Sequence, residues 1–224
     1  MNICMIPVRK GSQRLPKKNY LKIGKHTILE IAILKAIASK AFKKIVINTD
    51  DPSLEKIASR LGVDFYLRDK RLASSEATSD QVVLDFFNHY SGDRIFWLNT
   101  ASPLQTLSDV KNFVDFAQKK SWKSGVSINT NLAHILYKSN PINFVWKNGF
   151  ARTQDLEPVQ ILNYAMMGWH RSMIDKLKVG QLFDNNTDFI CSSKWSSFLL
   201  KNEKDLELIK ILSKVAPDQG FKFK

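Results

Sequence analysis

The chain has 224 residues, of which 44% are hydrophobic, and a formal net charge of +13 at pH 7. This length and apolar content predict a single domain, residues 1–224, built around one sizeable core. The charge favours polyanionic partners such as phosphorylated small molecules, nucleic acid or an acidic membrane surface. No apolar run approaches the roughly 18 residues that a membrane-spanning helix needs, so we expect no membrane segment.

The two cysteines, Cys4 and Cys191, both lie in apolar runs, and neither belongs to a CxxC or Cys/His cluster. We therefore predict buried free thiols rather than a disulfide or a zinc site, which suits a reducing cytoplasm. The N-terminal apolar stretch is too short for a signal peptide and lacks a cleavage site of small residues. Together these features predict a cytoplasmic protein.

Short apolar strands alternate with helical patterns over the first 130 residues. Strands are expected at 3–8, 43–49, 63–67, 94–99 and 125–129, with helices at 27–40, 53–62, 79–90 and 108–120. Thr27 and Glu30 have the spacing of a capping box, Ser53 and Ser108 are candidate N-caps, and Gly62 is a stop signal. Near-continuous apolar strands alternating with helices predict an α/β fold with a doubly wound, mostly parallel sheet.

The alternation stops after about residue 131. The Asn148–Gly149 pair stands between apolar residues and predicts a hairpin. A strand is expected at 161–169, a return to the sheet at 187–193, and an amphipathic helix at 203–215. We therefore predict a small inserted subdomain at 131–175, and its many large apolar residues favour association with a second copy.

The first strand, residues 3–8, leads directly into a basic loop that contains Arg9, Lys10, Arg14, Lys17 and Lys18. In an open parallel sheet ligands bind beyond the carboxyl ends of the strands, so this loop is expected at the mouth of a site. Gly11 and Ser12 would let the backbone approach a phosphate and offer amide donors. Neither a Walker A loop nor a GxGxxG fingerprint is present. The alternative interpretation is a basic surface loop with no ligand.

The segment IPVRKGSQRLPKKN, residues 6–19, closely resembles the first motif of the acylneuraminate cytidylyltransferases, which is usually similar to IPARxGSKRxPxKN. Five further segments resemble motifs of that family in the same order: VINTDD (46–51), LRDKRLASSEATSDQVV (67–83), LNTASPLQT (98–106), ARTQDLEPVQILNYA (151–165) and EKDLEL (203–208). These enzymes make CMP-activated sialic acids and related nonulosonates, and CMP-Kdo synthetases are relatives. The resemblance implies a fold like that of the nucleotide-diphospho-sugar transferases, and a homodimer formed through the inserted subdomain.

The resemblance also implies roles for individual residues. Arg9 and Lys18 are the implied catalytic cations, and the implied nucleotide-binding set is Arg9, Gly11, Ser12, Lys18, Asn19, Arg68, Ser79 and Asn99. The implied sugar-binding set is Asn99, Lys138, Arg152 and Asn163. The substrates would be CTP and an acidic sugar, and Mg²⁺ would be the expected cofactor.

The sequence departs from the family at the metal-binding segment, which usually reads like SIDIDTxEDLEL. Here the segment is SFLLKNEKDLEL, residues 197–208, so Leu199 and Lys201 stand at the positions of the two aspartates. Neither side chain can coordinate Mg²⁺, which needs oxygen ligands. The glycine of the family's NGA motif is replaced by Tyr164. We therefore expect no metal ligand at either position.

Two functions from different classes remain open at this stage. The first is a cytidylyltransferase that activates a nonulosonate sugar with CTP, releasing pyrophosphate. The second is a non-catalytic nucleotide- or sugar-binding homologue that has lost the metal site. A third reading, nucleic-acid binding through the net charge, has no supporting motif, so no nucleic-acid partner is expected.

Overall fold

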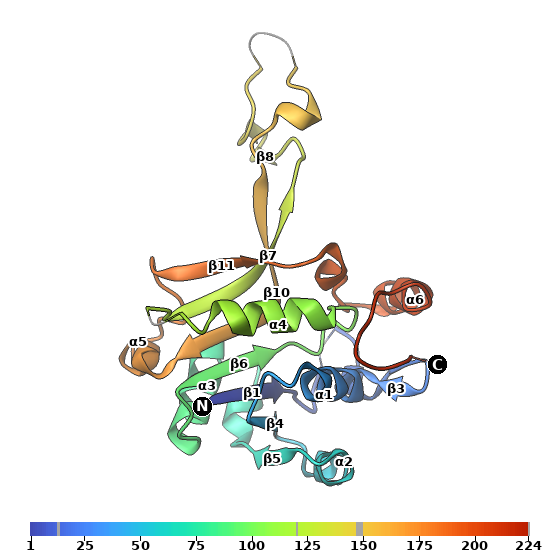
Figure 1. Ribbon diagram of the computed structural model, residues 1–224, viewed down its shortest axis with the longest axis vertical. Coiled ribbons are helices and arrows are strands. Elements are labelled where there is room, and N and C mark those ends of the chain that lie inside the picture. The colour runs from blue at the N-terminus through green and yellow to red at the C-terminus, as the bar shows by residue number, and fades with distance from the viewer. Residues whose placement is uncertain (13, 120, 147–149, 224) are drawn as a thin grey trace.

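The computed structural model of the chain describes residues 1–12, 14–119, 121–146 and 150–223. Its centre is a seven-stranded sheet with the strand order β11-β7-β10-β6-β1-β4-β5 (Figure 1). The strands are β1 (Asn2–Pro7), β4 (Lys44–Thr49), β5 (Asp64–Leu67), β6 (Arg94–Leu98), β7 (Ser124–Asn131), β10 (Val159–His170) and β11 (Thr187–Cys191). Only β10 runs antiparallel to its neighbours β6 and β7. The prediction of an α/β fold with a mostly parallel sheet is therefore confirmed.

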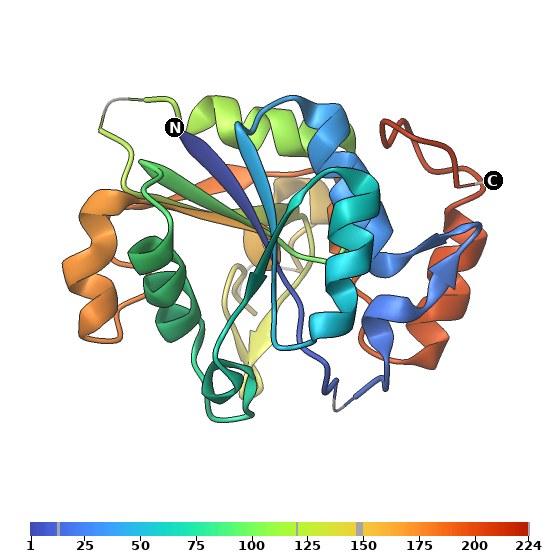
Figure 2. The ribbon, with the colours of Figure 1, turned by 90° about the horizontal axis from the view of Figure 1, so that it is seen from below.

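Helices cover both faces of this sheet, as Figure 2 shows with the sheet seen nearly edge-on. The helices α1 (Ile28–Ser39), α2 (Glu55–Leu61) and α4 (Leu107–Phe116) pack on one face, and α3 (Ser79–His89) and α5 (Ile174–Lys178) pack on the other. Helix α6 (Glu203–Leu212) packs beside α1, next to the short pair β2 (Lys22–Ile23) and β3 (His26–Thr27). Short 3-10 helices occur at 18–20, 52–54, 70–73, 153–155, 171–173 and 194–197.

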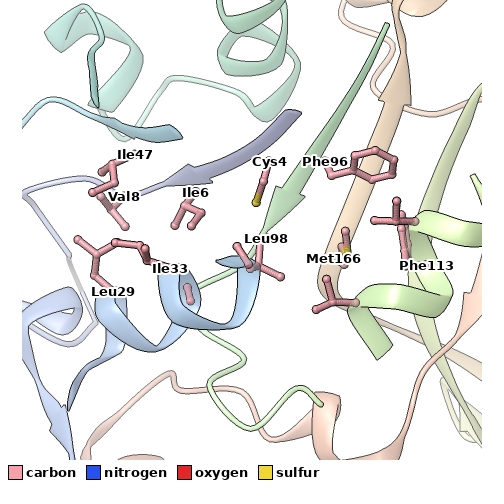
Figure 3. Close-up of a cluster of buried hydrophobic side chains, with 14 of the residues drawn as sticks. Cys4, Ile6, Val8, Leu29, Ile33, Ile47, Phe96, Leu98, Phe113 and Met166 are labelled. Carbon is pink, nitrogen blue, oxygen red and sulfur yellow. The ribbon is translucent and has the colours of Figure 1, made fainter. Parts of the chain in front are cut away.

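The alternation of side chains along β1 explains why the strand is apolar throughout. Cys4 and Ile6 point into the core beneath α1, whereas Ile3 and Met5 point into the core beneath α3. Figure 3 shows the first of these cores, in which Leu29 and Ile33 of α1 approach Ile6. Because both faces are covered, the strand has no side that must be polar.

The helix starts agree with the sequence in one case and differ in two. Thr27 caps α1 through a complete capping box with Glu30, as predicted. Ser53 and Ser108 are not the caps that we expected. The side chain of Asp51 caps the 3-10 turn at 52–54, and Thr106 caps α4. In both segments a Ser lies close to another good capping residue, Asp51 or Thr106, so residue type alone does not decide the cap.

An extended arm leaves the sheet where β7 and β10 run on beyond it, at the top of Figure 1. It carries the small pair β8 (Leu136–Tyr137) and β9 (Asn140–Pro141). The predicted turn at Asn148–Gly149 lies outside the described residues. The predicted subdomain 131–175 is too wide, because residues 166–170 of β10 pair with β6 inside the central sheet. The strand periodicity gave no sign of where the arm ends and the sheet resumes.

Both cysteines are free thiols, but only Cys4 is buried, whereas Cys191 is exposed. The prediction that both are buried is therefore wrong for Cys191. Its strand β11 lies at the edge of the sheet, so one neighbouring strand is absent and the last residue of β11 reaches the surface. Among the described residues, none of the helices has the length and apolar composition needed to cross a membrane.

Candidate active site

A cavity of about 540 Å³ lies at the carboxyl ends of β1 and β6. The loop after β1 and the loop before α3 both reach this end of the molecule, at the bottom of Figure 2. Five cationic side chains line the cavity: Arg9, Arg14, Lys18, Arg68 and Lys201. An apolar part of the wall is formed by Leu72, Val82, Trp97 and Leu200. The position beyond the strand ends is the one predicted for the basic loop.

Asn19 connects the basic loop to the loop after β6. The Asn19 side chain is 7% exposed. Its Nδ2 donates a hydrogen bond to the carbonyl oxygen of Arg9 at 3.5 Å, and its Oδ1 accepts one from the hydroxyl of Thr100 at 3.1 Å. Asn19 therefore lines the cavity with its amide already engaged, and its main effect is to position Arg9 and Thr100.

Two aspartates after β4 hold the basic loop from outside. The Oδ1 of Asp50 accepts a hydrogen bond from the backbone N–H of Lys10 at 2.9 Å, and the Oδ2 of Asp51 accepts one from the hydroxyl of Tyr20 at 2.7 Å. Burial acts to raise the pKa of Asp51, but the hydrogen bonds from Ser53 and Tyr20 outweigh it and lower that pKa. Both carboxylates thus support the loop, and neither belongs to the cavity lining.

Lys18 and Arg68 are cations in surroundings that disfavour charge. Burial lowers the pKa of Lys18, and the nearby Arg14 and Arg9 lower it further. Arg68 is only 5% exposed, and burial likewise lowers its pKa. Its Nη1 donates hydrogen bonds to the carbonyl oxygen and the Oδ1 of Asn48, at 3.1 Å and 3.0 Å, while its buried Nε has no partner within the described part of the chain. An anion bound in the cavity would favour the charged forms of both side chains and so raise both pKa values.

The amino-terminal end of α3 also reaches the cavity, because Thr78 and Ser79 both line it. Thr78 forms a capping box with Gln81, so the first turn of the helix is well formed. Helix amino termini carry partial positive charge and free N–H groups, which favour bound anions. Ser79, which belongs to the predicted nucleotide-binding set, thus lines the cavity at the start of α3.

Asn99 lines the cavity at the end of β6, but its amide is also tied to the backbone. The Oδ1 accepts a hydrogen bond from the N–H of Ala101 at 2.9 Å, and the Nδ2 donates one to the carbonyl oxygen of Tyr164 at 3.1 Å. Ser12 is also part of the lining, whereas the exposed Gly11 is not. A methyl group at Gly11 would meet no atom within 4 Å, so the fold alone does not require glycine there.

The three remaining residues of the predicted sugar-binding set lie outside the cavity. Lys138 and Arg152 belong to the arm, and Arg152 forms an exposed ion pair with Asp155 at 2.6 Å. Asn163 is 3% exposed and buried in β10. Its Oδ1 accepts hydrogen bonds from the Ser127 hydroxyl at 2.6 Å and from the Ala165 N–H at 3.0 Å. Within this one chain, only Asn99 of that set faces the cavity.

Several cavity residues were absent from the predicted site. Arg14 belongs to the basic loop, and its charge was the available signal. No signal in the sequence pointed to Trp97, because an aromatic residue within a strand is also typical of a buried core. Trp97 is half-buried and its ring contacts that of Trp169 edge-to-face, with 6.5 Å between the ring centroids. It provides the cavity with a large aromatic surface.

The residues of the cavity do not fit a magnesium ion. Lys201 lines the cavity and also a smaller depression beside it, in which Leu199 lies with Asp205, Leu208 and Ile209. The described residues of the cavity lining include no Asp or Glu. No group of three or more His, Cys, Asp or Glu side chains able to hold a metal occurs in the described ranges. Mg²⁺ is usually held through carboxylates, whereas every charged side chain among the described lining residues is a cation and the remaining side-chain oxygens are neutral hydroxyls and amides.

The comparison with known sequences identifies one family. A profile described as cytidylyltransferase matches residues 3–161. The N-acylneuraminate cytidylyltransferase of Streptococcus agalactiae serotype III is 29% identical over 173 residues, which are 73% of this chain and 42% of that protein. The chain thus spans less than half the length of this relative. The post-translational flagellin modification protein B of Campylobacter coli is 26% identical over 230 residues, covering 95% of this chain and 94% of that protein.

The comparison with solved structures supports the fold. A CMP:2-keto-3-deoxy-manno-octonic acid synthetase complexed with CTP matches with a TM-score of 0.71 and 13% identity, over 96% of this chain and 98% of that one. At this identity the match concerns the fold alone. The matched segment 3–161 includes the basic loop, Arg68, Ser79 and Asn99, and it covers well over half of the sequence. The chain belongs to the cytidylyltransferase family.

Proposed function

We propose that the protein transfers the cytidylyl group of CTP to a nonulosonate, an acidic sugar of the sialic acid type, and releases pyrophosphate. The observation that carries this proposal is the cavity at the strand ends, in which Arg9, Lys18 and Arg68 converge from two loops. Their charges suit a triphosphate, and family membership supports cytidylyl transfer. The name of the S. agalactiae relative supports a sialic acid as the type of acceptor.

The reaction requires one bond to form and one to break at the α-phosphorus of CTP. The anomeric hydroxyl oxygen of the sugar attacks this phosphorus, and the bond to the oxygen that bridges to the β-phosphate breaks. Pyrophosphate leaves with the bonding electron pair, and the hydroxyl proton passes to solvent. Such transfers depend mainly on positioning and on charge stabilisation. In this proposal Arg9 and Lys18 stabilise the negative charge that develops on the phosphate oxygens.

The arm supports a homodimer as part of the same proposal. Several of its large apolar side chains are more than half exposed, namely Tyr137 64%, Ile142 60%, Val145 66%, Trp146 64% and Phe150 65%. Exposed apolar surface on this scale favours burial against another chain. Lys138 and Arg152 would then contribute to the sugar side of the cavity of the partner subunit. The two free thiols agree with the cytoplasmic location that we propose.

A second candidate is a homologue that binds a nucleotide or a sugar without transferring it. The observation that favours it is the absence of carboxylates from the described cavity lining. A pyrophosphate-release assay distinguishes the two functions. Each of CTP, ATP, GTP and UTP is combined with N-acetylneuraminic, pseudaminic, legionaminic or 2-keto-3-deoxy-manno-octonic acid. Transfer predicts pyrophosphate with CTP and at least one of these sugars. CTP binding without pyrophosphate release in any combination would favour the second candidate.

A further inference from the structure

The cavity lining carries several cations, and the charges of Asp50 and Asp85, which lie outside the lining, only partly oppose the effect of burial on Arg68. Arg9, Arg14, Lys18, Arg68 and Lys201 all line the cavity, and none of the described lining residues is a carboxylate. Arg68 is the most buried of them, at 5% exposed, and among the described residues its side chain donates hydrogen bonds only to Asn48. The buried Nε of this guanidinium lacks a partner among the described residues, so a bound anion could accept a hydrogen bond from it.

Three acids beside the loops of the cavity accept hydrogen bonds from those loops. Asp50 accepts a hydrogen bond from the Lys10 backbone, and Asp51 holds Tyr20 and Ser53. The Oδ2 of Asp205 accepts hydrogen bonds from the backbone N–H groups of Lys201 and Asn202, at 2.8 Å and 3.0 Å. These three carboxylates thus stabilise loops around the cavity instead of presenting oxygens to its interior.

The segment before α6 fixes the place of Lys201. The N–H of Leu200 donates to the carbonyl oxygen of Ala101 at 2.8 Å, and the Leu200 side chain is 1% exposed. The next residue, Lys201, is held by Asp205 through its own N–H. With its backbone anchored on both sides, Lys201 stands at the edge of the cavity while its side chain stays exposed.

We propose that the cavity binds the free polyphosphate end of the nucleotide in preference to its magnesium complex, and that Lys201 supplies part of the positive charge beside the phosphates. This inference rests on the proposed function for the identity of the nucleotide. Guanidinium and ammonium groups donate charge-assisted hydrogen bonds directly to phosphate oxygens. A magnesium ion on the same oxygens would cancel two of their charges and occupy positions that these donors need. The cations of the cavity and Mg²⁺ therefore compete for the same phosphates.

Calorimetric titration with inorganic tripolyphosphate and with CTP tests this competition. Each titration is run in EDTA and in MgCl₂, with NaCl added to the EDTA buffer to equalise ionic strength, because salt alone screens such contacts. We expect both ligands to bind in EDTA, and their apparent affinities to fall at least about tenfold when Mg²⁺ is in excess. Binding that needs Mg²⁺, or that is equal in the two buffers, would overturn the inference.

Variants at Lys201 test its role directly. Lys201→Ala is expected to weaken tripolyphosphate binding in EDTA about tenfold, since it removes one charge-assisted contact. Lys201→Asp is expected to weaken tripolyphosphate binding in EDTA more than Lys201→Ala does, because it places a negative charge beside the phosphates. Lys204→Ala is the matched control, because Lys204 is an exposed lysine of α6 outside the cavity lining. Equal affinities for Lys201→Ala and Lys204→Ala would contradict the role of Lys201.

Two further measurements separate this inference from the proposed function. Thermal unfolding of each unliganded variant shows whether it is folded, and the exposed position of Lys201 predicts unchanged melting temperatures. Tripolyphosphate lacks the base and the sugar, so its response to Mg²⁺ reports on the charge of the cavity alone. If tripolyphosphate binds as expected but CTP is not preferred to ATP, the inference stands and the proposed function fails. If CTP is preferred to ATP but binds only with Mg²⁺, the inference fails and the proposed function stands.

Discussion

The side-chain Nδ2 of Asn99 donates a hydrogen bond of 3.1 Å to the carbonyl oxygen of Tyr164. This bond joins the cavity lining to an irregular turn of β10, where the pairing with β7 shifts between Leu162 and Met167. Tyr164 has a φ of +53°, a backbone conformation that favours glycine. Its neighbours Asn163 and Ala165 are buried, so the Tyr164 side chain projects outward and is 42% exposed. A tyrosine is thus held in a glycine conformation beside the candidate active site.

The strained backbone at Tyr164 leads to a stability prediction. A left-handed conformation costs a residue other than glycine about 1–2 kcal/mol, whereas glycine loses part of this advantage through its greater flexibility in the unfolded chain. We expect Tyr164→Gly to be about 1 kcal/mol more stable than Tyr164→Ala in urea unfolding. Both variants lack the ring, so their difference reports on the backbone. An alanine variant as stable as the glycine variant would contradict this explanation.

Asn163 is expected to contribute to stability more than to ligand affinity. Its side chain accepts hydrogen bonds from Ser127 and Ala165 and donates one to the Ser192 hydroxyl at 2.8 Å. Asn163→Ala leaves these buried groups without partners. The free energy of unfolding should therefore fall by about 2 kcal/mol or more. CTP affinity should stay unchanged. Asn140→Ala, at an exposed arm position, is the control, with a change within about 0.5 kcal/mol. An Asn163→Ala variant as stable as the unmodified protein would contradict this structural role and favour the predicted sugar contact.

Arg9 and Lys18 are expected to be required for nucleotide binding. Arg9→Ala and Lys18→Ala each remove a charge-assisted contact worth about 1.5–3 kcal/mol, which is about a tenfold to hundredfold loss of CTP affinity. Lys10→Ala is a matched control, because Lys10 is exposed in the same loop and its bond to Asp50 uses the backbone N–H. Calorimetry measures all three variants. Unchanged affinity in both Arg9→Ala and Lys18→Ala would place the nucleotide elsewhere.

The buried Lys35 predicts a specific dependence of stability on pH. Its Nζ donates a hydrogen bond to the carbonyl oxygen of Pro103 at 3.0 Å. Burial lowers the pKa of Lys35 to about 7, although the charge of Asp109 partly opposes this. Between this value and the unfolded value near 10.5, the unfolded chain binds a proton that the folded chain lacks. The free energy of unfolding therefore increases as the pH rises through this range.

Substitution of Lys35 isolates this contribution from that of other titrating groups. Lys35→Met keeps the length of the side chain and removes the amine, so the part of the pH dependence that belongs to Lys35 should disappear. Urea unfolding of both proteins between pH 7 and pH 10 gives the difference. Parallel stability curves over this range would show that the Lys35 amine stays protonated in the folded protein.

The arm predicts association through its apolar surface. We expect light scattering to give about twice the 25.7 kDa of one chain at micromolar protein. The double variant Val145→Ser and Trp146→Ser removes two side chains that are 66% and 64% exposed, so it should shift the protein towards monomer without loss of the fold. The double variant Lys176→Ser and Lys178→Ser changes α5, outside the arm, and should leave the mass unchanged. A monomer of the unmodified chain would contradict this prediction.

The local order of strands and helices could be predicted from the sequence because it depends on short-range pattern. The apolar run of β1, the capping box at Thr27 and the stop at Gly62 each act within a few residues, and all three appear in the structure. The basic loop could be placed at a ligand site by the same reasoning, since the carboxyl end of a parallel strand has a fixed relation to the sheet. Family motifs then named three of the five cations that line the cavity, Arg9, Lys18 and Arg68.

Only the tertiary structure decided which of the expected site residues meet. Lys138, Arg152 and Asn163 were all expected at the sugar side, yet Asn163 is buried in β10, whereas Lys138 and Arg152 lie in the arm between β7 and β10. Trp97 and Lys201 come from distant segments and reach the same cavity. The order in which strands pair and the path of the arm depend on contacts between distant segments, which a local pattern does not encode. The sequence by itself thus determined the cationic character of the site. The packing of β6, β10 and the segment before α6 decided which residues line it.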